Sequence, residues 1–467
     1  MKTTFKRSLA AWAAAVASTA FAAGEATNVI FFLGDGMGPT TVTASRIYKY
    51  GETGKLTMET LPRTARIKTY SNDAQTTDSA PSMAAYMTGV KMNNEVISMS
   101  ADTKAYATTL DSSKYVSGSD STCPASGNGT SVPTLLELAK AAGKGTGAVT
   151  TTEITHATPA ATYAHICHRD GANNIAAQAV PGGSGYNSAL TYGTDKGVDV
   201  LLGGGRKFFL PTSAGGARTD TRDLTAELQT QGYTYVADKT AFDAVSTTTT
   251  NKLVGLFNST HMDYELDRVT TAEPSLADMT EKAIKILQKN NKGFFLMVEG
   301  GRIDHALHGT NAKKALEDTI AFDDAIKRAL GLVDLKNTLI VVTADHDHTM
   351  TFNGYAHKGN PILGKVTDIK QTTVTGAPVL AKAADNLPYT ALVFGNGGTT
   401  RSTPRVDTTN VDTTATAYRQ EVGIPLSSET HGGGDVMLMA TGVGSSGFKG
   451  TMVNTKVFGL IKSALGL

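Results

Sequence analysis

The sequence predicts an α/β fold built around a largely parallel sheet. Apolar runs at 28–33, 294–297 and 338–342 have the composition of strands that are buried on both faces. Amphipathic helical stretches, such as 132–142 and 275–289, lie between these runs along the chain. Strands that alternate with helices are typical of α/β proteins whose sheet is mostly parallel.

Each of three predicted strands ends in an acidic residue. Asp35, Glu299 and Asp345 stand at these ends. In α/β sheets, ligands bind where the strands finish at their carboxyl ends. The three carboxylates therefore predict one shared site.

The stretch 298–308 is the most informative of these strand ends. Asp304 and His308 are four residues apart, so one helical turn would place both on the same face. A carboxylate oxygen and an imidazole nitrogen suit a divalent ion such as zinc. The alternative interpretation is a solvated loop in which the histidines occur by chance.

The N-terminal segment 1–22 has the pattern of a signal peptide. Three basic residues precede an apolar run at 9–21, which is too short to span a bilayer comfortably, and 20–22 fits a small-x-small cleavage site. We expect its removal to leave a single domain, 23–467, that is secreted, periplasmic or extracellular and has no membrane anchor. A retained anchor is the alternative.

Composition excludes some classes of partner. The hydrophobic fraction of 40% is enough to form a sizeable core. The net charge is +1, and loss of the three charges in 1–22, which has no acidic residue, leaves −2. This charge predicts neither a nucleic-acid-binding surface nor a polybasic membrane patch. Cys123 and Cys167 remain, either as a disulfide, which an oxidising compartment permits, or as two separate buried thiols.

Two regions have the composition of insertions. Residues 99–130 are rich in Ser, Thr, Gly and Asp and are expected to form surface structure. Residues 351–426 are rich in Thr and Gly with few helical patterns, which predicts a subdomain of loops and short strands.

Ser79 is a candidate nucleophile. Asp78 is placed to cap a helix that has Pro81 in its first turn and stops at Gly89. Ser79 would then lie where backbone N–H groups and the helix dipole favour an anion such as a phosphoryl group. The alternative is an ordinary serine at the start of a helix.

Further polar residues follow in 149–169 and 429–435. Arg169 could make a bidentate contact to phosphate, or it could be an ordinary surface arginine. His165 and His168 are interpreted as structural. His431 lies among glycines, which allow the backbone to approach a site closely.

Taken in order, these motifs resemble those of the alkaline phosphatases. The resemblance covers essentially the whole chain after the leader and rests on the segments 34–38, 77–80, 149–159, 198–205, 298–308, 343–346 and 429–433. It implies a large mixed, mostly parallel central sheet flanked by helices on both faces, with 351–426 as a crown-like subdomain, and a homodimer.

The resemblance also implies two Zn²⁺ and one Mg²⁺ per chain. One zinc would be held by Asp304, His308 and His431, and the second by Asp35, Asp345 and His346, with Ser79 beside it. Magnesium would be held by Asp35, Thr158 and Glu299, an all-oxygen set that suits a hard ion. Arg169 would bind the oxygens of the phosphate.

Two positions depart from the best-known bacterial pattern. His156 stands where many bacterial members have Asp, and His305 where they have Lys; both are similar to the animal enzymes. His305 is expected to contact phosphate through water, and His156 leaves the identity of the third metal open.

The function implied is hydrolysis of phosphate monoesters with broad specificity, through a phosphoserine at Ser79. A sulfatase is one alternative, although its Cys/Ser-x-Pro-x-Arg motif fails here because Met83 follows Ser82. A phosphomutase of the same superfamily would be cytosolic, and the signal-peptide pattern argues against this alternative. A secreted protein that binds zinc or phosphate without turnover is the third alternative.

Overall fold

The computed structural model describes residues 26–467 except 108–112, 117 and 399–403. The predicted signal peptide, 1–22, lies outside the described residues and stays a prediction.

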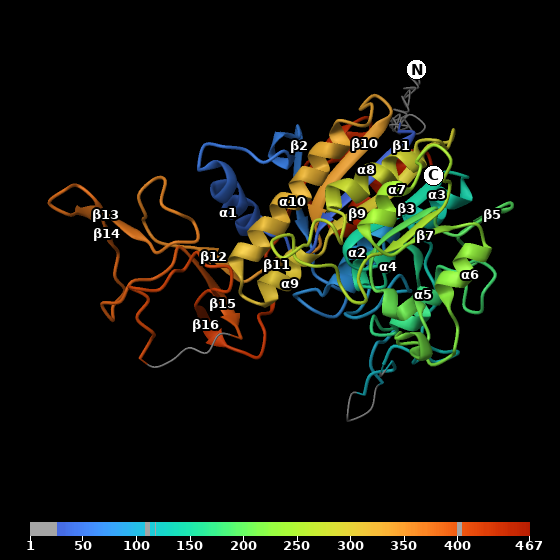
Figure 1. Cartoon of the computed structure of the whole chain (residues 1–467), viewed down its shortest axis with the longest axis horizontal. Coiled ribbons are helices and arrows are strands. Elements are labelled where there is room, and N and C mark those ends of the chain that lie inside the picture. Colours follow the sequence, from blue (N-terminus) through green and yellow to red (C-terminus); the bar gives the residue numbers. More distant parts are fainter. Residues whose placement is uncertain (1–25, 108–112, 117, 399–403) are drawn as a thin grey trace, which may run out of the picture.

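The core of the molecule is one ten-stranded sheet (Figure 1). Its spatial order is β19 (Gly450–Val453), β2 (Arg63–Lys68), β18 (Val436–Gly442), β10 (Thr338–Ala344), β1 (Asn28–Gly34), β9 (Phe294–Gly300), β3 (Gly145–Glu153), β6 (Val200–Gly204), β8 (Leu253–Leu256) and β7 (Thr234–Val236). Only β18 runs antiparallel to its neighbours, β10 and β2. The predicted mixed, mostly parallel sheet is therefore confirmed.

The central strands are buried along their whole length. Every residue of β1, β9 and β10 is buried. Such burial requires cover on both faces, and this explains why these strands read as continuous apolar runs rather than as alternating patterns.

Helices pack in two groups around the sheet. One group contains α1 (Pro39–Tyr50), α8 (Leu276–Leu287), α9 (Arg302–His308) and α10 (Ala312–Leu330). The other contains α2 (Ser79–Thr88), α3 (Leu135–Ala141), α4 (Ala157–Tyr163) and α11 (Asn454–Leu465). The shorter helices α5 (Ala172–Gln178), α6 (Leu224–Thr230) and α7 (Lys239–Ala244), the 3-10 turns η1 (Met58–Thr60), η2 (Arg206–Phe209), η3 (Thr212–Ala214) and η4 (Ser445–Gly447), and the hairpin β4 (Thr191–Tyr192) with β5 (Asp195–Lys196) complete the main body.

The start of α2 has the local structure predicted for it. The Asp78 side chain accepts a hydrogen bond from Ala80 N at 2.8 Å, so Asp78 is the N-cap and Ser79 the first helical residue. The helix ends at Gly89, whose left-handed φ of 74° is one that glycine adopts without strain. Ser79 is thereby fixed at a helix N-terminus.

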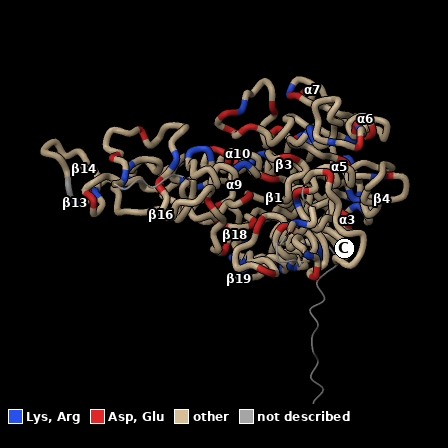
Figure 2. The backbone as a smooth tube through the Cα atoms, turned by 90° about the horizontal axis from the view of Figure 1, so that it is seen from below, with Lys and Arg blue, Asp and Glu red and all other residues tan. Residues whose placement is uncertain are grey.

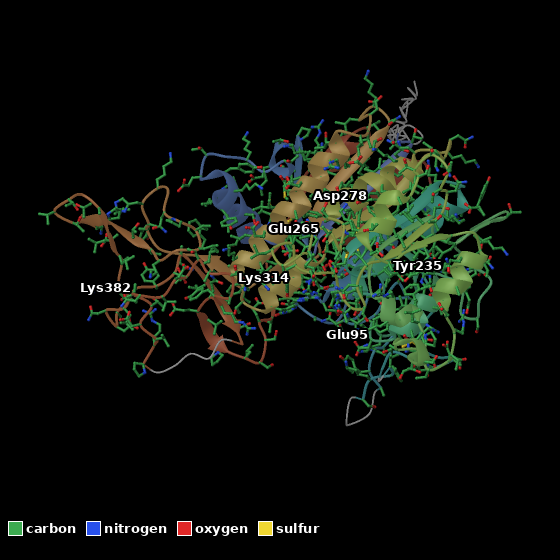
Figure 3. All side chains as sticks on the ribbon, in the orientation of Figure 1. Glu95, Tyr235, Glu265, Asp278, Lys314 and Lys382 are labelled. Atoms are coloured by element: carbon green, nitrogen blue, oxygen red, sulfur yellow. A yellow bond between two sulfur atoms is a disulfide. The ribbon has the colours of Figure 1, made fainter. Side chains whose placement is uncertain are left out.

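Residues 351–426 form small sheets at one end of the molecule (Figure 1). β12 (Met350–Phe352), β15 (Leu392–Gly397) and β16 (Val422–Pro425) make one sheet, and β13 (Thr367–Thr372) pairs with β14 (Pro378–Leu380). In Figure 3, Lys382 of this segment lies at the opposite end from Tyr235. Its description as a crown-like subdomain of a single domain stays a prediction.

Cys123 and Cys167 are joined by a disulfide, which decides between the two alternatives left by the sequence. Among the described residues, no helix is both long and apolar enough to cross a bilayer. Acidic and basic residues are interspersed along the backbone (Figure 2), in keeping with the near-zero net charge. The disulfide is consistent with a location outside the cytoplasm.

Candidate active site and metal centre

The three acidic strand ends meet, as the sequence predicts. Asp35 directly follows β1 and Asp345 directly follows β10, which lies beside β1, while Glu299 lies opposite Leu33 near the end of β9 on the other side. Because these three strands are parallel, their carboxyl ends share one edge of the sheet. All three acidic side chains are fully buried there.

Asp304, His308 and His431 form the first cluster. Asp304 and His308 face the same way from α9, and His431 approaches from β17 (His431–Gly432), which pairs with β11 (Asp347–His348). Asp304 Oδ1 lies 3.3 Å from His308 Nε2 and 3.6 Å from His431 Nε2, and the two Nε2 atoms are 3.1 Å apart.

Backbone carbonyls fix the tautomers of both histidines in this cluster. His308 Nδ1 donates to the carbonyl of Glu429 at 2.6 Å, and His431 Nδ1 donates to that of Thr77 at 2.8 Å. A carbonyl only accepts, so each Nδ1 carries the proton and each Nε2 has a free lone pair. The neighbouring ligands of a tetrahedral zinc are about 3.3 Å apart, which the three separations match.

His348 and Glu429 complete this cluster, and sequence analysis missed both. His348 Nε2 contacts Asp304 Oδ1 at 2.7 Å, and its Nδ1 contacts Glu429 Oε2 at 2.6 Å. Carboxylate oxygens accept, so both ring nitrogens donate and His348 is a cation rather than a metal ligand. Against the opposing effect of burial, these two carboxylates raise the pKa of His348 to about 10.

Close approach to His348 explains one glycine of the 34–38 motif. Gly36 has a φ of +63°, and a Cβ at this position would lie 2.4 Å from His348 Nε2. A larger residue would displace the imidazole from Asp304.

Asp35, Asp345, His346 and Ser79 form the second cluster. His346 Nε2 lies 3.3 Å from Asp35 Oδ1 and 3.4 Å from Asp345 Oδ2. Ser79 Oγ is 3.1 Å from His346 Nε2 and 3.3 Å from Asp35 Oδ1. His346 Nδ1 donates to the carbonyl of Asp347, so its Nε2 lone pair faces this group.

The second cluster has unsatisfied oxygens. Asp35 Oδ2 and Asp345 Oδ2 are buried and have no hydrogen-bond partner among the described residues. Burial, followed by the nearby carboxylates of Asp345 and Asp304, raises the pKa of Asp35 well above its usual value. Buried carboxylates so arranged need a cation, and the donor set of two oxygens and one imidazole nitrogen fits zinc.

The third cluster joins Asp35 and Glu299 to Thr158 and His156. The hydroxyl of Thr158 donates to Glu299 Oε1, and that of Thr152 to Glu299 Oε2 at 3.3 Å. Burial raises the pKa of Glu299 to about 7 although these hydroxyls oppose it. A ring nitrogen of His156 lies within 4.8 Å of oxygens of both carboxylates, so the set offers one nitrogen besides its oxygens.

Arg169 and His305 lie beside these clusters. Arg169 donates to Asp78 Oδ1 at 3.2 Å and to His156 Nε2 at 2.9 Å, so the cap of the Ser79 helix also holds the guanidinium. Arg302 donates to His305 Nδ1 at 2.7 Å, which leaves the proton of neutral His305 on Nε2. Burial lowers the pKa of His305 to about 4.

The imidazole of His261 lies beside those of His305 and His156, and sequence analysis did not identify it. Its ring centroid lies 4.4 Å from that of His305 and 5.3 Å from that of His156. No motif in the sequence marks His261. By contrast, His165 bonds to Glu137 at 2.6 Å and His168 lies beside Asp170, so neither belongs to the clusters.

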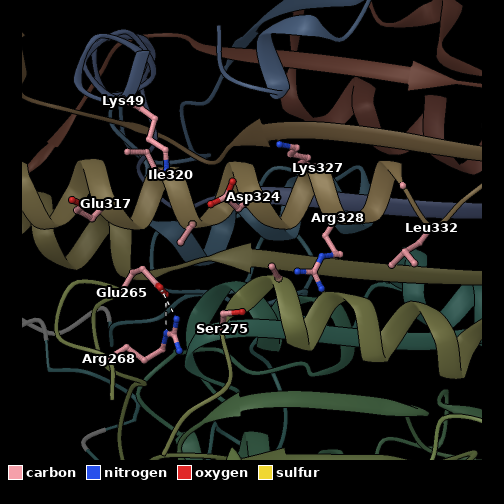
Figure 4. Close-up of a pocket in the computed structure, with 13 residues that line it drawn as sticks. Lys49, Glu265, Arg268, Ser275, Glu317, Ile320, Asp324, Lys327, Arg328 and Leu332 are labelled. Carbon is pink, nitrogen blue, oxygen red and sulfur yellow. Dashed lines mark hydrogen bonds and ion pairs between the residues drawn. The ribbon is translucent and has the colours of Figure 1, made fainter. Parts of the chain in front are cut away.

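A cavity of about 720 Å³ lies away from these clusters. It is lined by charged residues of both signs, mostly from α10 and the segment before α8 (Figure 4). Lys49, Glu265 and Asp324 are examples, and no residue of the three metal clusters lines it. The chemistry therefore concentrates at the edge of the sheet and not in this cleft.

The fold and the clusters of candidate metal ligands, with Ser79 beside them, are those of a metal-dependent hydrolase, and comparisons with known proteins give its family. The family model described as "Alkaline phosphatase" matches residues 26–467. The chain therefore belongs to the alkaline phosphatase family and is a metal-dependent phosphomonoesterase.

Relatives and solved structures agree with this assignment. The chain is 38% identical to the tissue-nonspecific isozyme of alkaline phosphatase from Rattus norvegicus, over 89% of this chain and 79% of that protein. It is also 38% identical to the alkaline phosphatase of Gadus morhua, over 90% and 87%. The crystal structure of the Thermus thermophilus alkaline phosphatase superposes with a TM-score of 0.67 at 25% identity, covering 98% of this chain and 96% of that one.

Proposed function

We propose that this alkaline phosphatase hydrolyses a broad range of phosphate monoesters through a covalent phosphoserine on Ser79. The observation that carries the proposal is the position of Ser79 Oγ, 3.1 Å from His346 Nε2 and 3.3 Å from Asp35 Oδ1. A hydroxyl at the remaining corner of a candidate zinc site is placed to lose its proton and act as a nucleophile.

The donor sets support two zinc ions and one magnesium ion per chain. Asp304, His308 and His431 would hold one zinc, and the second would be held by Asp35, Asp345 and His346. Magnesium would be held by Asp35, Thr158 and Glu299. A solved mutant of the TAB5 alkaline phosphatase, 24% identical to this chain, has Mg bound in its M3 site.

When bound, the ions would lower the pKa of the serine hydroxyl and of water and neutralise developing negative charge. Ser79 Oγ attacks phosphorus, the bond from phosphorus to the alcohol oxygen breaks, and the alcohol leaves with a proton. Water then attacks the phosphoserine, releases inorganic phosphate and returns Ser79 to its free form.

Arg169 would orient the phosphoryl group. Its guanidinium is held on one side by Asp78 and His156, so it is pre-organised before substrate binds. His305, with its proton on Nε2, can donate a hydrogen bond to phosphate or to an intervening water. His156 completes this phosphate-facing set. None of these roles requires a contact to the alcohol, which supports broad specificity.

The test is turnover of p-nitrophenyl phosphate at alkaline pH by the purified protein and by Ser79→Ala. We expect Ser79→Ala to lose activity and covalently bound phosphate after acid quench, and to retain its metal content. Ser45→Ala is the matched control, because Ser45 is fully buried and its hydroxyl has no partner among the described residues. Near-full activity of Ser79→Ala would rule out the covalent route, and faster turnover of the matching sulfate ester would favour a sulfatase.

We also propose that the protein is secreted or periplasmic and acts as a homodimer. The signal-peptide pattern of 1–22 and the disulfide support export. Exposed apolar side chains in 351–426, among them Phe352, Tyr355 and Ile424, are 47%, 86% and 62% exposed and support an interface between copies. Light scattering on the full mature chain tests the dimer, and a monomer at working concentration would exclude it.

A further inference from the structure

Glu429 has a role that the proposed mechanism does not use. Its side chain is fully buried, and both carboxylate oxygens are occupied. Oε2 accepts from His348 Nδ1 at 2.6 Å, and Oε1 accepts from the N–H and the hydroxyl of Thr349 at 2.7 and 2.6 Å. These three donors hold the carboxylate in a single orientation.

The backbone of Glu429 holds a second group. Its carbonyl accepts from His308 Nδ1 at 2.6 Å, and its N–H donates to the carbonyl of His308 at 3.2 Å. The backbone of Glu429 therefore fixes the position and the tautomer of His308.

The side chain of Glu429 reaches Asp304 through one intermediate. His348, which Glu429 holds by Nδ1, contacts Asp304 Oδ1 at 2.7 Å through Nε2. His348 is also paired with His431 across the two short strands β11 and β17. One residue thus connects to Asp304 through its side chain, to His308 through its backbone, and to His431 along the chain.

We propose that Glu429 is a positioning residue, which holds Asp304 through His348 and thereby sets how tightly the first cluster retains zinc. The inference rests on the proposed zinc site, and it assigns Glu429 no contact with substrate. Partners that hydrogen-bond to metal ligands fix their orientation, and losing one typically weakens metal binding about 10–100-fold.

The variant Glu429→Gln tests the role of the side chain apart from the role of the backbone. The variant keeps the shape and the carbonyl that holds His308. It replaces one carboxylate oxygen by an NH₂ group, which cannot accept from His348 or Thr349. We expect one zinc per chain to be lost to a competing chelator at about 10–100-fold lower chelator concentration, with the second zinc unchanged.

Glu273→Gln is the matched control. Glu273 is 3% exposed and accepts from Asn258 Nδ2 at 2.8 Å and from Asp263 N at 3.0 Å, so it is another buried glutamate held by two donors. It belongs to none of the metal clusters. We expect its zinc retention to equal that of the wild type.

Two further measurements separate positioning from a general loss of structure. Excess zinc should restore kcat of Glu429→Gln with little change in KM, and the metal-free variant should still unfold in one cooperative transition, as the metal-free wild type does. His348→Gln should weaken zinc binding similarly, and adding Glu429→Gln to it should cause little further loss, because both act on Asp304 through one route.

The outcomes distinguish this inference from the proposed function. A wild-type protein without zinc-dependent turnover would overturn the proposed function. The inference alone would be overturned if the wild type held two zinc ions and Glu429→Gln retained zinc against the chelator as well as Glu273→Gln does. If Glu429→Gln does not fold, Glu429→Asp, which keeps the charge but shortens the reach, must show the same selective zinc loss or the inference is wrong.

Discussion

The first and second metal clusters solve the same electrostatic problem in different ways. In the first, the carboxylate of Asp304 already faces a protonated His348, and the imidazoles of His308 and His431 are tied to carbonyls. In the second, Asp35 and Asp345 each have a buried oxygen without a partner among the described residues. The first cluster is held in place by protein groups, whereas the second depends on a bound cation to offset its charge.

The pKa directions show the same contrast. Although burial opposes it, the neighbouring His308 and His348 hold the pKa of Asp304 well below its usual value. Burial and nearby carboxylates raise the pKa of Asp35 instead. We therefore expect the first cluster to keep its geometry without metal and the second to be strained when its carboxylates are ionised.

Removing charge from the second cluster gives the largest expected effect. Asp345→Asn should lower kcat/KM at least about 10³-fold, because a bound metal supplies several kcal/mol of charge stabilisation. The same variant should make the metal-free protein more stable by about 1–3 kcal/mol, the usual cost of an unsatisfied buried polar group. Activity assays and urea unfolding in chelator test both. If metal-free Asp345→Asn were less stable than the metal-free wild type, the proposed difference between the two clusters would be wrong.

The pH dependence of the metal-free protein is the second test. Glu299 has a pKa raised from 4.5 to about 7, so its neutral form is favoured by folding and the stability it contributes is lost as pH rises through 7. The loss between pH 5 and 8 should be about 3 kcal/mol at most. Thermal unfolding in chelator across this range measures it, and Glu299→Gln should flatten the curve.

The first cluster should lose stability in the same direction but at higher pH. His348, with a pKa raised from 6.5 to about 10, contributes stability that is full below its unfolded value and is lost as pH rises from there through 10. His348→Gln should therefore flatten the curve above neutral pH and leave the slope between pH 5 and 6 unchanged. If the slope below pH 6 disappeared in this variant, the two clusters would not titrate separately.

The smallest expected effect concerns the third cluster. Thr158→Val removes the hydroxyl that donates to Glu299 and would ligate magnesium. We expect the magnesium dependence of activity to shift about tenfold towards higher concentration, comparable to the loss of one supporting ligand contact. Titration of the chelated enzyme with magnesium measures it, and Thr158→Ser should behave like the wild type.

Local sequence patterns were sufficient to find the residues that one element supplies alone. Strand ends identified Asp35, Glu299 and Asp345, and helical spacing identified Asp304 with His308. The mixed sheet followed from the alternation of apolar runs and helices, together with the family resemblance. These features depend on residues that are near one another in the chain.

Features that depend on pairing between distant segments could not be predicted. His348 and Glu429 meet across 81 positions through β11 and β17, and neither has a spacing that marks a ligand. The Cys123–Cys167 bond was left open for the same reason, since nothing in the sequence states the separation of two points 44 residues apart. His261 enters the site from a loop without a motif.

The bond between His431 and Thr77 has a consequence for how the enzyme matures. It spans 354 positions and joins His431, near the C-terminus, to the segment that carries Ser79. Contacts between parts so distant along the chain carry a large loop-closure cost and form slowly relative to local structure. The first cluster therefore takes its final geometry only once both segments are in place, and we expect full binding of the proposed zinc ions to follow folding rather than to precede it.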